Sequence, residues 1–263
     1  MDIRKLFSLE GRVALVTGAT HGLGMAVATA LAGAGATLAV NGHSADRLDK
    51  ALKTYENKGI DAKGYLFDVT DEQAVAEGVA RIEREAGPID ILVNNAGIIK
   101  RIPALEMTLP EWNEVIATDL TSPFLMSRAV AAGMIRRGHG KIVNMCSMMS
   151  EVGRSSVTAY AAAKGGLKML TKNLATEWAK HNIQVNGIAP GYMVTDNTAK
   201  LRQNREAVAA ITAQIPLGRW GKPEDLMGPV VFLASNASNF VNGHLLVADG
   251  GFDGFILKTT GLD

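Results

Sequence analysis

The strongest constraint on the fold of this chain is an alternation that runs from one end to the other. Short apolar segments alternate with longer segments whose apolar residues recur at helical spacing. Several apolar segments are continuous, as in Val13-Ala14-Leu15-Val16 and Ile89-Asp90-Ile91-Leu92-Val93. Strands that are buried on both faces require such continuous runs. The alternation therefore predicts a doubly wound α/β fold built on a parallel sheet.

The predicted elements follow one another without a break that would separate two domains. The strand candidates, about seven in number, are Arg12–Thr17, Thr37–Asn41, Asp61–Phe67, Asp90–Asn94, Lys141–Cys146, Ile183–Ile188 and His244–Val247. The helix candidates are Gly22–Ala34, Ala45–Lys58, Asp71–Ala86, Leu109–Arg137, Tyr160–Lys180 and Pro223–Leu233. The chain has no internal repeat, low-complexity tract or linker, so we expect a single domain over residues 1–263.

Two late segments depart from the alternation of strands and helices. The segment Thr195–Gln214 is polar and helical in pattern. We expect this insertion, near residues 195–214, to be a mobile lid beside the carboxyl ends of the strands. Residues 252–263 form an apolar tail, which we expect to dock on a neighbouring subunit.

The composition argues against several classes of protein. Lys+Arg 27 and Asp+Glu 26 leave a net charge of +1, which gives no positive excess to hold nucleic acid. The single cysteine, Cys146, forms neither an intrachain disulfide nor a multi-cysteine metal site, and the first residues lack the apolar stretch of a signal peptide. The longest weakly polar stretch, Met25–Val40, is too short to span a membrane. We therefore expect a cytoplasmic protein that binds neither nucleic acid nor membranes, and we predict no metal site.

The first predicted strand ends in a glycine-rich turn, Thr17-Gly18-Ala19-Thr20-His21-Gly22-Leu23-Gly24. Gly18 permits a tight turn, Gly22 lets the backbone approach a pyrophosphate, and Gly24 lets helix and strand pack closely. The N–H groups at the start of the next helix then point at the anion. The turn therefore predicts a dinucleotide site, and an ordinary glycine-rich turn is the alternative. The predicted cofactor-binding residues here are Gly18, Thr20, His21, Gly22, Leu23 and Gly24.

The end of the second predicted strand bears on the choice between the two nicotinamide cofactors. A carboxylate at this place binds the ribose 2′-OH of NAD and repels the 2′-phosphate of NADP. The candidates are Asn41, Gly42, His43 and Ser44, and none of them is acidic. We predict cofactor contacts from Gly42 and His43, and hydrogen bonds from His21 and His43 to a 2′-phosphate. NADP is thus preferred and NAD stays open, while plain exposure to solvent is the alternative for both histidines.

Three residues have the spacing of a reaction centre for hydride transfer. Ser147 follows a predicted strand, and Tyr160 and Lys164 come later at positions i and i+4 of a helix, on one face. A phenol is a poor base at neutral pH, and a nearby ammonium lowers its pKa, so we expect Lys164 to bring Tyr160 into working range. Tyr160 would then exchange a proton with the substrate oxygen while Ser147 hydrogen-bonds the same atom.

These residues resemble the short-chain dehydrogenases/reductases over nearly the whole chain. The matching segments are Thr17–Gly24, Asp68-Val69, Asn94-Asn95-Ala96-Gly97, Ser147, Tyr160 with Lys164, Pro190-Gly191 and Thr195. The resemblance implies a Rossmann fold, an NAD(P)-dependent oxidoreductase and, in most members, a homotetramer.

The resemblance also implies roles for residues of the cofactor site. Asp68 and Val69 would contact the adenine, and the segment Asn94-Asn95-Ala96-Gly97 would line the ribose side. Three later residues would hold the nicotinamide, its carboxamide and the adjoining phosphate. They are Pro190, Gly191 and Thr195.

One residue departs from the family pattern. Many members have an asparagine that completes a water site for proton relay, and Asp119 stands at that position in this chain. This departure leaves the chemistry of Ser147, Tyr160 and Lys164 intact, but the family pattern no longer predicts the geometry of the proton relay. Asp119 either substitutes for the asparagine, as a candidate catalytic residue, or belongs to a helix kink.

Local segments of the chain are similar to family members that act on C5 of six-carbon sugar acids. The segments are Cys146–Arg154, Tyr160–Leu170, Ile188–Met193, Arg219–Met227 and Ser238–His244. The similarity implies interconversion of gluconate and 5-ketogluconate. The alternatives are 2-dehydro-3-deoxy-gluconate, another polyol or 3-oxoacyl compound, and a protein that senses NADP without turnover.

A sugar acid brings a carboxylate and several hydroxyl groups, so its pocket needs a cation and short polar side chains. Arg154 is the first candidate for the carboxylate because it follows Ser147, and Lys100 and Arg101 follow the Asn94–Gly97 segment. A surface arginine without a ligand is the alternative for each. The predicted substrate-binding residues are Arg101, Ser147, Arg154, Tyr160 and Tyr192.

Overall fold

The computed structural model of the chain describes residues 2–254. Within them, one parallel sheet of seven strands has the order β3-β2-β1-β4-β5-β6-β7. The strands are β1 (Val13–Val16), β2 (Thr37–Gly42), β3 (Ala62–Leu66), β4 (Ile89–Asn94), β5 (Gly140–Met145), β6 (Ile183–Pro190) and β7 (Leu245–Ala248). The order reverses between β1 and β4, which in doubly wound sheets opens a crevice at the carboxyl ends of these strands. The predicted fold class is confirmed.

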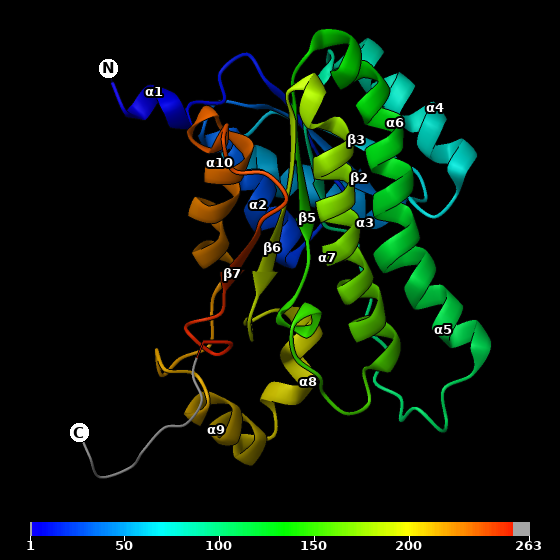
Figure 1. Ribbon diagram of the computed structural model, residues 1–263, viewed down its shortest axis with the longest axis vertical. Helices are drawn as coiled ribbons and strands as arrows, with labels where there is room; N and C mark the ends of the chain where they lie inside the picture. Colours follow the sequence, from blue (N-terminus) through cyan, green and yellow to red (C-terminus); the bar gives the residue numbers. More distant parts are fainter. Residues whose placement is uncertain (1, 255–263) are drawn as a thin grey trace.

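Helices cover both faces of the sheet (Figure 1). The α-helices are α1 (Arg4–Phe7), α2 (Gly22–Gly33), α3 (Ala45–Asn57), α4 (Glu72–Glu85), α5 (Leu109–Ile116), α6 (Ser122–Arg137), α7 (Thr158–Trp178), α8 (Ala199–Arg202), α9 (Arg205–Ala213) and α10 (Met227–Ala234). Short 3₁₀ turns are η2 (Met148–Ser150), η3 (Ala179–His181), η4 (Asp196–Thr198), η5 (Pro223–Leu226) and η6 (Asn236–Ser238).

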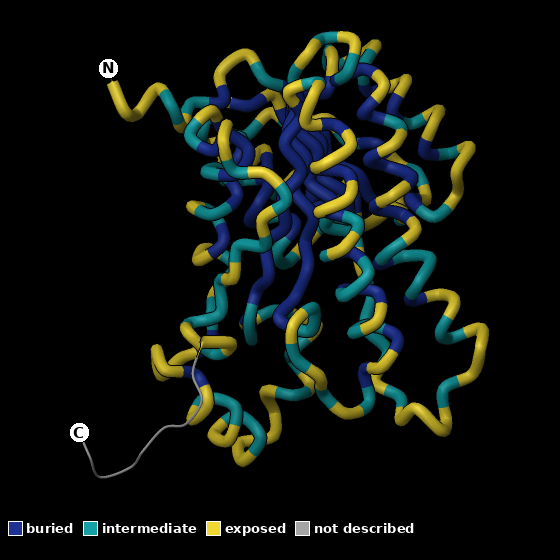
Figure 2. The backbone as a smooth tube through the Cα atoms, in the orientation of Figure 1, coloured by how far each residue is buried: buried dark blue, intermediate teal, exposed yellow. Residues whose placement is uncertain are grey.

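The core lies in two layers because side chains alternate along each buried strand. In β1, Ala14 and Val16 pack with residues of α2, α3 and α10. Leu15, between them, packs on the other face with residues of α4, α6 and α7. Figure 2 shows the central strands as the buried centre of the molecule, with exposed backbone on the outer helices. The continuous apolar runs in the sequence are explained by this burial from both sides.

The segment 109–137, predicted as one helix, is divided by a π-helical turn, η1 (Ala117–Thr121). Pro123 has no N–H group, so it cannot donate the α-helical hydrogen bond to the carbonyl of Asp119, four residues earlier. The hydroxyl of Ser122 donates instead to the carbonyl of Thr118 at 2.7 Å. Such π-turns often mark functional sites, and this one carries a buried carboxylate, that of Asp119.

The segment 195–214 and the described start of the tail, residues 252–254, lie near the carboxyl end of β6. The segment predicted as a lid forms η4, α8 and α9, seen below the sheet in Figure 1. Most of the predicted tail, residues 255–263, lies outside the described residues. Phe252, at its start, packs edge-on against the ring of Tyr192 at 5.7 Å. In residues 2–254, every helix is too short or too polar to cross a membrane.

Candidate active site

A cleft of about 560 Å³ opens at the carboxyl ends of the strands, on both sides of the switch point between β1 and β4. Except for Asn94 and Lys100, the structure brings the site residues predicted from the sequence to this one cleft. They are Gly18, Thr20, His21, Gly22, Leu23, Gly24, Gly42, His43, Asp68, Val69, Asn95, Ala96, Gly97, Arg101, Asp119, Ser147, Arg154, Tyr160, Lys164, Pro190, Gly191, Tyr192 and Thr195. Segments far apart in the sequence therefore form one site.

The glycine turn has the backbone that its sequence predicts. Gly18 and Gly22 have φ angles of +61° and +55°, in the left-handed region that favours glycine. A Cβ at Gly24 would lie 2.4 Å from Nδ2 of Asn95, so helix α2 packs too closely here for any side chain. No side chain caps the N-terminus of α2, which leaves its first N–H groups for a ligand.

Three side chains that the sequence analysis did not assign to this role hold the turn. Asn95 donates from Nδ2 to the carbonyls of Thr17 and Gly18, at 2.9 and 3.1 Å. The phenol of Tyr55, on α3, donates to the carbonyl of Ala19 at 2.7 Å. Asn41 accepts at its Oδ1 from the N–H of Gly18 at 3.5 Å, and its amide donates to the carbonyl of Phe67 at 3.0 Å. No local sequence signal marks Tyr55, because its contact depends on how α3 packs.

Asn94 and Asn95 have separate roles although they are neighbours. The side chain of Asn94 is buried and donates to Oδ1 of Asn144 at 2.8 Å and to the hydroxyl of Ser127 at 3.0 Å. Adjacent side chains of a strand point to opposite faces of the sheet. The expectation that Asn94 lines the ribose side of the cleft is therefore wrong for its side chain, whereas Asn95 does line the cleft.

The end of β2 is followed by a histidine rather than by an acidic residue. His43 follows Gly42, the last residue of β2, and both line the cleft. His21 lies across the glycine turn, where its Nδ1 is 3.1 Å from the hydroxyl of Thr20. Both histidines are exposed. The place where a ribose 2′-substituent is read in such folds is thus open and free of acidic side chains.

Ser147, Tyr160 and Lys164 converge at the other end of the cleft. Ser147 begins the turn after β5, and its hydroxyl accepts from the N–H of Met149 at 3.1 Å. Tyr160 and Lys164 lie one turn apart on α7, with Nζ of Lys164 5.5 Å from the centre of the phenol ring. The hydroxyl of Ser147 interacts with the phenol of Tyr160. The spacing in the sequence correctly predicts that the three groups meet.

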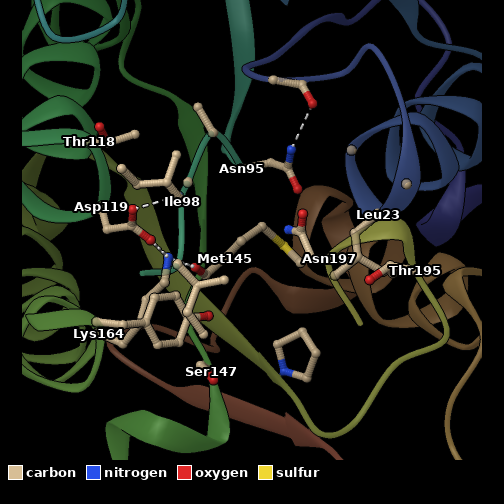
Figure 3. Close-up of a pocket in the computed structure, with 18 of the residues that line it drawn as sticks. Leu23, Asn95, Ile98, Thr118, Asp119, Met145, Ser147, Lys164, Thr195 and Asn197 are labelled. Atoms are coloured by element: carbon tan, nitrogen blue, oxygen red, sulfur yellow. Dashed lines mark hydrogen bonds and ion pairs between the residues drawn. The ribbon is translucent and has the colours of Figure 1, made fainter. Parts of the chain in front are cut away.

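Asp119 lies behind Lys164, and its carboxylate is fully buried. Its Oδ2 is 3.0 Å from Nζ of Lys164, and its Oδ1 accepts from the N–H of Ile98 at 2.8 Å (Figure 3). Nζ of Lys164 also donates to the carbonyl of Met145 at 2.9 Å. A Cβ at Gly97 would lie 2.8 Å from the carboxylate, so glycine is needed for this close approach.

The ion pair changes the electrostatics that the sequence predicts. Burial raises the pKa of the Tyr160 phenol, the ammonium of Lys164 lowers it, and the carboxylate of Asp119 raises it, with an upward net effect. Burial lowers the pKa of Lys164, but the charges of Asp119 and Tyr160 raise it by a larger amount. The net shift of the Lys164 pKa is therefore upward. Lys164 lowers the pKa of Tyr160, as expected, but burial outweighs this effect and Asp119 opposes it, so the pKa of Tyr160 is raised on balance.

The cysteine beside this centre is buried directly after β5. Burial raises the pKa of the Cys146 thiol to about 11. Among residues 2–254, no group of three or more His, Cys, Asp or Glu residues could hold a metal ion.

The arginines expected near the substrate differ in how they are engaged. Arg101 donates to the backbone carbonyl of Asn197 at 3.2 Å. Its neighbour Lys100 forms an ion pair with Glu114, at 2.5 Å between Nζ and Oε2. The guanidinium of Arg154 lies over the ring of Tyr192, 5.7 Å from its centre, and has no ion pair with another described residue. Arg154 is therefore the cation of the three best placed to receive a ligand's carboxylate.

Comparison with known proteins places the chain in a family. A family model described as enoyl-(acyl carrier protein) reductase matches residues 18–253. The 2-dehydro-3-deoxy-D-gluconate 5-dehydrogenase of Formosa agariphila is 56% identical over 97% of this chain and 96% of its own length. The gluconate 5-dehydrogenase of Gluconobacter oxydans is 48% identical over 94% and 96%. The chain is a short-chain dehydrogenase/reductase.

A solved structure extends the comparison to three dimensions. The gluconate 5-dehydrogenase of Burkholderia cenocepacia, in complex with NADP and tartrate, has a TM-score of 0.93. It is 39% identical to this short-chain dehydrogenase/reductase and covers 96% of this chain and 99% of its own. The close match in fold confirms the architecture that the alternation in the sequence predicts.

The residues of this dehydrogenase fit a nicotinamide dinucleotide. A Cβ at Gly22 would meet no protein atom within 4 Å, so the turn leaves open space above the uncapped N-terminus of α2. A pyrophosphate requires this combination of free N–H groups and close access to the backbone. The same cleft continues from the turn to Ser147 and Tyr160, so one elongated ligand can reach both ends.

Proposed function

We propose that this protein interconverts the C5 alcohol and the C5 ketone of a six-carbon sugar acid, with NADP(H) as the hydride carrier. The observation that carries the proposal is the convergence of Ser147, Tyr160 and Lys164 in the cleft that holds the glycine turn. A proton donor, a hydrogen-bond donor and an anion-binding turn in one cleft are what reversible reduction of a carbonyl requires.

The chain's own residues supply the proton and position the substrate. The bound dinucleotide supplies the hydride of reduction and accepts the hydride of oxidation. In reduction, Tyr160 donates its phenolic proton to the C5 oxygen, while Ser147 hydrogen-bonds the same oxygen. In oxidation, the Tyr160 phenolate removes the proton from the C5 hydroxyl. Lys164, held by the carbonyl of Met145, stabilises the phenolate through its charge.

Further residues of the cleft support the cofactor half of the proposal. We assign the pyrophosphate to the glycine turn, the adenine to Asp68 and Val69, and the 2′-phosphate to His21 and His43. We assign the nicotinamide end to the segment from Pro190 to Thr195. The absence of an acidic side chain at the end of β2 supports NADP, and the Burkholderia cenocepacia relative is described with NADP.

Two sugar acids compete as the substrate. Gluconate and 5-ketogluconate are the first pair, since the Gluconobacter oxydans relative is named a gluconate 5-dehydrogenase. The second is 2-dehydro-3-deoxy-D-gluconate, favoured by the higher identity, 56% against 48%, to the relative that is named for it. In either case we assign the carboxylate of the substrate to Arg154, with Tyr192 and Arg101 lining the same end of the cleft.

Initial rates test the proposal directly. NADPH and NADH are each oxidised with 5-ketogluconate, and NADP and NAD are each reduced with gluconate or 2-dehydro-3-deoxy-D-gluconate. The proposal predicts turnover with at least one of these sugar acids and a higher kcat/KM with NADPH than with NADH. In Arg154→Gln, KM for the sugar acid should rise while NADPH binding is unchanged. Tight NADPH binding without turnover of any carbonyl compound would instead indicate a nucleotide sensor.

The lid is also part of this proposal. Thr195 and Asn197 line the cleft, and the bond from Arg101 to the carbonyl of Asn197 joins the segment to the opposite wall. We infer that residues 195–214 open to admit the substrate. In Arg101→Ala, this contact is lost, and proteolysis within the segment should become faster unless the sugar acid and NADP are bound.

The assembly and the compartment complete the proposal. We expect a homotetramer, because Phe124 on α6 and Met169 on α7 are large apolar side chains exposed on neighbouring helices. Light scattering after gel filtration measures the mass, and a monomer would contradict this expectation. We place the enzyme in the cytoplasm, where its pyridine nucleotide is found, and cell fractionation tests this assignment.

A further inference from the structure

The buried ion pair beside the reaction centre points to a control on its proton chemistry. We propose that Asp119 is a positioning residue whose carboxylate offsets part of the charge of Lys164, so that Tyr160 keeps its proton to a higher pH and oxidation of the alcohol is shifted toward alkaline conditions. The expected effect on the oxidation rate rests on the proposed function. The expected ionisation of Tyr160 does not, because it is measured without substrate.

The geometry makes Asp119 the dominant partner of Lys164. Nζ of Lys164 is 3.0 Å from Oδ2 of Asp119 but 5.5 Å from the centre of the Tyr160 ring. Asp119 is fully buried and Lys164 nearly so, so water screens their attraction poorly. A carboxylate bound this closely offsets part of the field that the ammonium exerts on the phenol, and it acts on the pKa of Tyr160 in the opposite direction to Lys164.

The structure holds the carboxylate in place independently of Lys164. The π-turn η1 turns Asp119 inward, and the N–H of Ile98 donates to its Oδ1 at 2.8 Å. Gly97 leaves the space that the carboxylate occupies. Because the π-turn and the loop after β4 both fix the position of Asp119, the ion pair is part of the folded structure rather than a contact that forms during turnover.

Other groups near Tyr160 do not replace Asp119 in this role. The titratable and charged groups that interact with Tyr160 or line the same cleft are Lys164 on α7, Asp119 on η1, Cys146 after β5, Glu114 on α5, Asp196 on η4, and Arg101, Arg154, Tyr192, His21, His43 and Asp68 on loops. Burial raises the pKa of Cys146 to about 11, which keeps this thiol neutral near pH 7. Glu114 is bound to Lys100. Asp119 is the carboxylate in direct contact with Lys164.

Each protonation state of Tyr160 serves one direction of the reaction. Reduction consumes the phenolic proton of Tyr160, which passes to the C5 oxygen as the hydride adds to C5. Oxidation needs the phenolate, which takes the C5 hydroxyl proton as the hydride leaves C5. A phenol that keeps its proton at neutral pH is ready for reduction, and the fraction ready for oxidation grows as the pH rises.

The substitution Asp119→Asn tests the proposal because it keeps the acceptor for Ile98 and removes the charge. Tyrosinate absorbance is titrated in the full chain, and the difference from the Tyr160→Phe variant isolates Tyr160 from the other tyrosines. We expect Tyr160 to ionise about one pH unit lower in Asp119→Asn than in the parent protein. The rising limb of the oxidation rate should move down by the same amount. The matched control, Glu114→Gln, removes a nearby carboxylate that does not contact Lys164 and should shift neither.

Each outcome decides the proposal. An unchanged or higher ionisation pH in Asp119→Asn overturns it, as does an equal shift in Glu114→Gln. If Asp119→Asn does not fold, the parent protein alone gives the answer, because Tyr160 should keep its proton beyond pH 9 and ionisation near pH 7 overturns the proposal. The absorbance titration needs no substrate. Failure to turn over sugar acids would therefore reject the proposed function but not this inference. The absorbance titration of Tyr160 would still decide the inference.

Discussion

His43 and His21 bring two titratable groups to the place where the 2′-phosphate of NADP is expected. Both side chains are exposed and line the cleft, where no carboxylate ends β2. A guanidinium carries a permanent positive charge and can bind a phosphate through two parallel hydrogen bonds, which an imidazole cannot do. Arginine at this place should therefore bind the 2′-phosphate of NADP more tightly than histidine does.

We predict that His43→Arg raises the affinity for NADPH several-fold and leaves the affinity for NADH unchanged, because only NADPH carries the 2′-phosphate. Fluorescence titration of each reduced cofactor measures these affinities, and NADH serves as the control. An equal change in both affinities would show that residue 43 does not contact the 2′-phosphate.

For single residues, the sequence predicts which side chains form the site, and which of them are neighbours, better than it predicts their pKa values. The i to i+4 spacing of Tyr160 and Lys164 suffices to place both side chains on one face of a helix. The pKa of Tyr160 depends on Asp119, which is far away in the sequence and reaches Lys164 only after a π-turn forms. Similarly, the engagement of Arg101 with Asn197 depends on the fold of the late helical segment. Such contacts have no local signature.

At the scale of elements, the glycine turn and helix α2 form the most sharply testable unit. A Cβ at Gly24 would lie 2.4 Å from Nδ2 of Asn95 and 2.5 Å from the carbonyl of Gly18. Gly24→Ala must therefore push α2 away from the turn and break the hydrogen bonds that Asn95 makes to it. We predict at least tenfold weaker NADPH binding, measured by fluorescence titration.

Helix α2 also provides the matched control for this substitution. Gly33 is the last residue of α2, and a Cβ there would meet no atom within 4 Å. Gly33→Ala should leave NADPH binding unchanged and slightly stabilise the helix. Equal effects of both substitutions on NADPH binding would contradict the role assigned to the turn.

The elements themselves follow from the sequence because their signals are local. Strands β1 and β4 are buried on both faces, and their continuous apolar runs are visible without any knowledge of the fold. The π-turn was not predicted, since a proline near the middle of a helical pattern is compatible with a kink, a break or a bulge. Which of these forms is decided by packing against Ile98, Gly97 and Lys164.

At the scale of the whole molecule, a buried lysine far from the cleft affects stability. Lys141, the second residue of β5, donates to Ser238 and Asn239, at 3.2 and 3.0 Å, without a carboxylate partner among the described residues. Burial lowers the pKa of its ammonium from 10.5 to about 8. Between these values the unfolded chain binds more protons than the folded one, so this lysine makes the free energy of unfolding rise as the pH increases from 8 to 10.5.

We predict that Lys141→Met raises the free energy of unfolding at pH 7 by on the order of 1 kcal/mol, because the buried charge is removed while the apolar stem is kept. The advantage of the variant should vanish above pH 10. Urea unfolding at both pH values, at one protein concentration, measures the difference. The exposed Lys180→Met serves as the control and should show no such dependence. A less stable variant at pH 7 would mean that the two hydrogen bonds outweigh the burial of the charge.

The whole account depends on Tyr160 as the group that exchanges a proton with the substrate in a cleft that binds the dinucleotide separately. The most direct test is the substitution Tyr160→Phe, which removes one oxygen and keeps the ring. The turnover number with NADPH and a sugar-acid ketone, 5-ketogluconate or the ketone of 2-dehydro-3-deoxy-D-gluconate, should fall by about 10² to 10⁴-fold. The dissociation constant for NADPH should remain within about threefold of the parent value, because the glycine turn is unchanged. Full turnover in this variant would contradict the account.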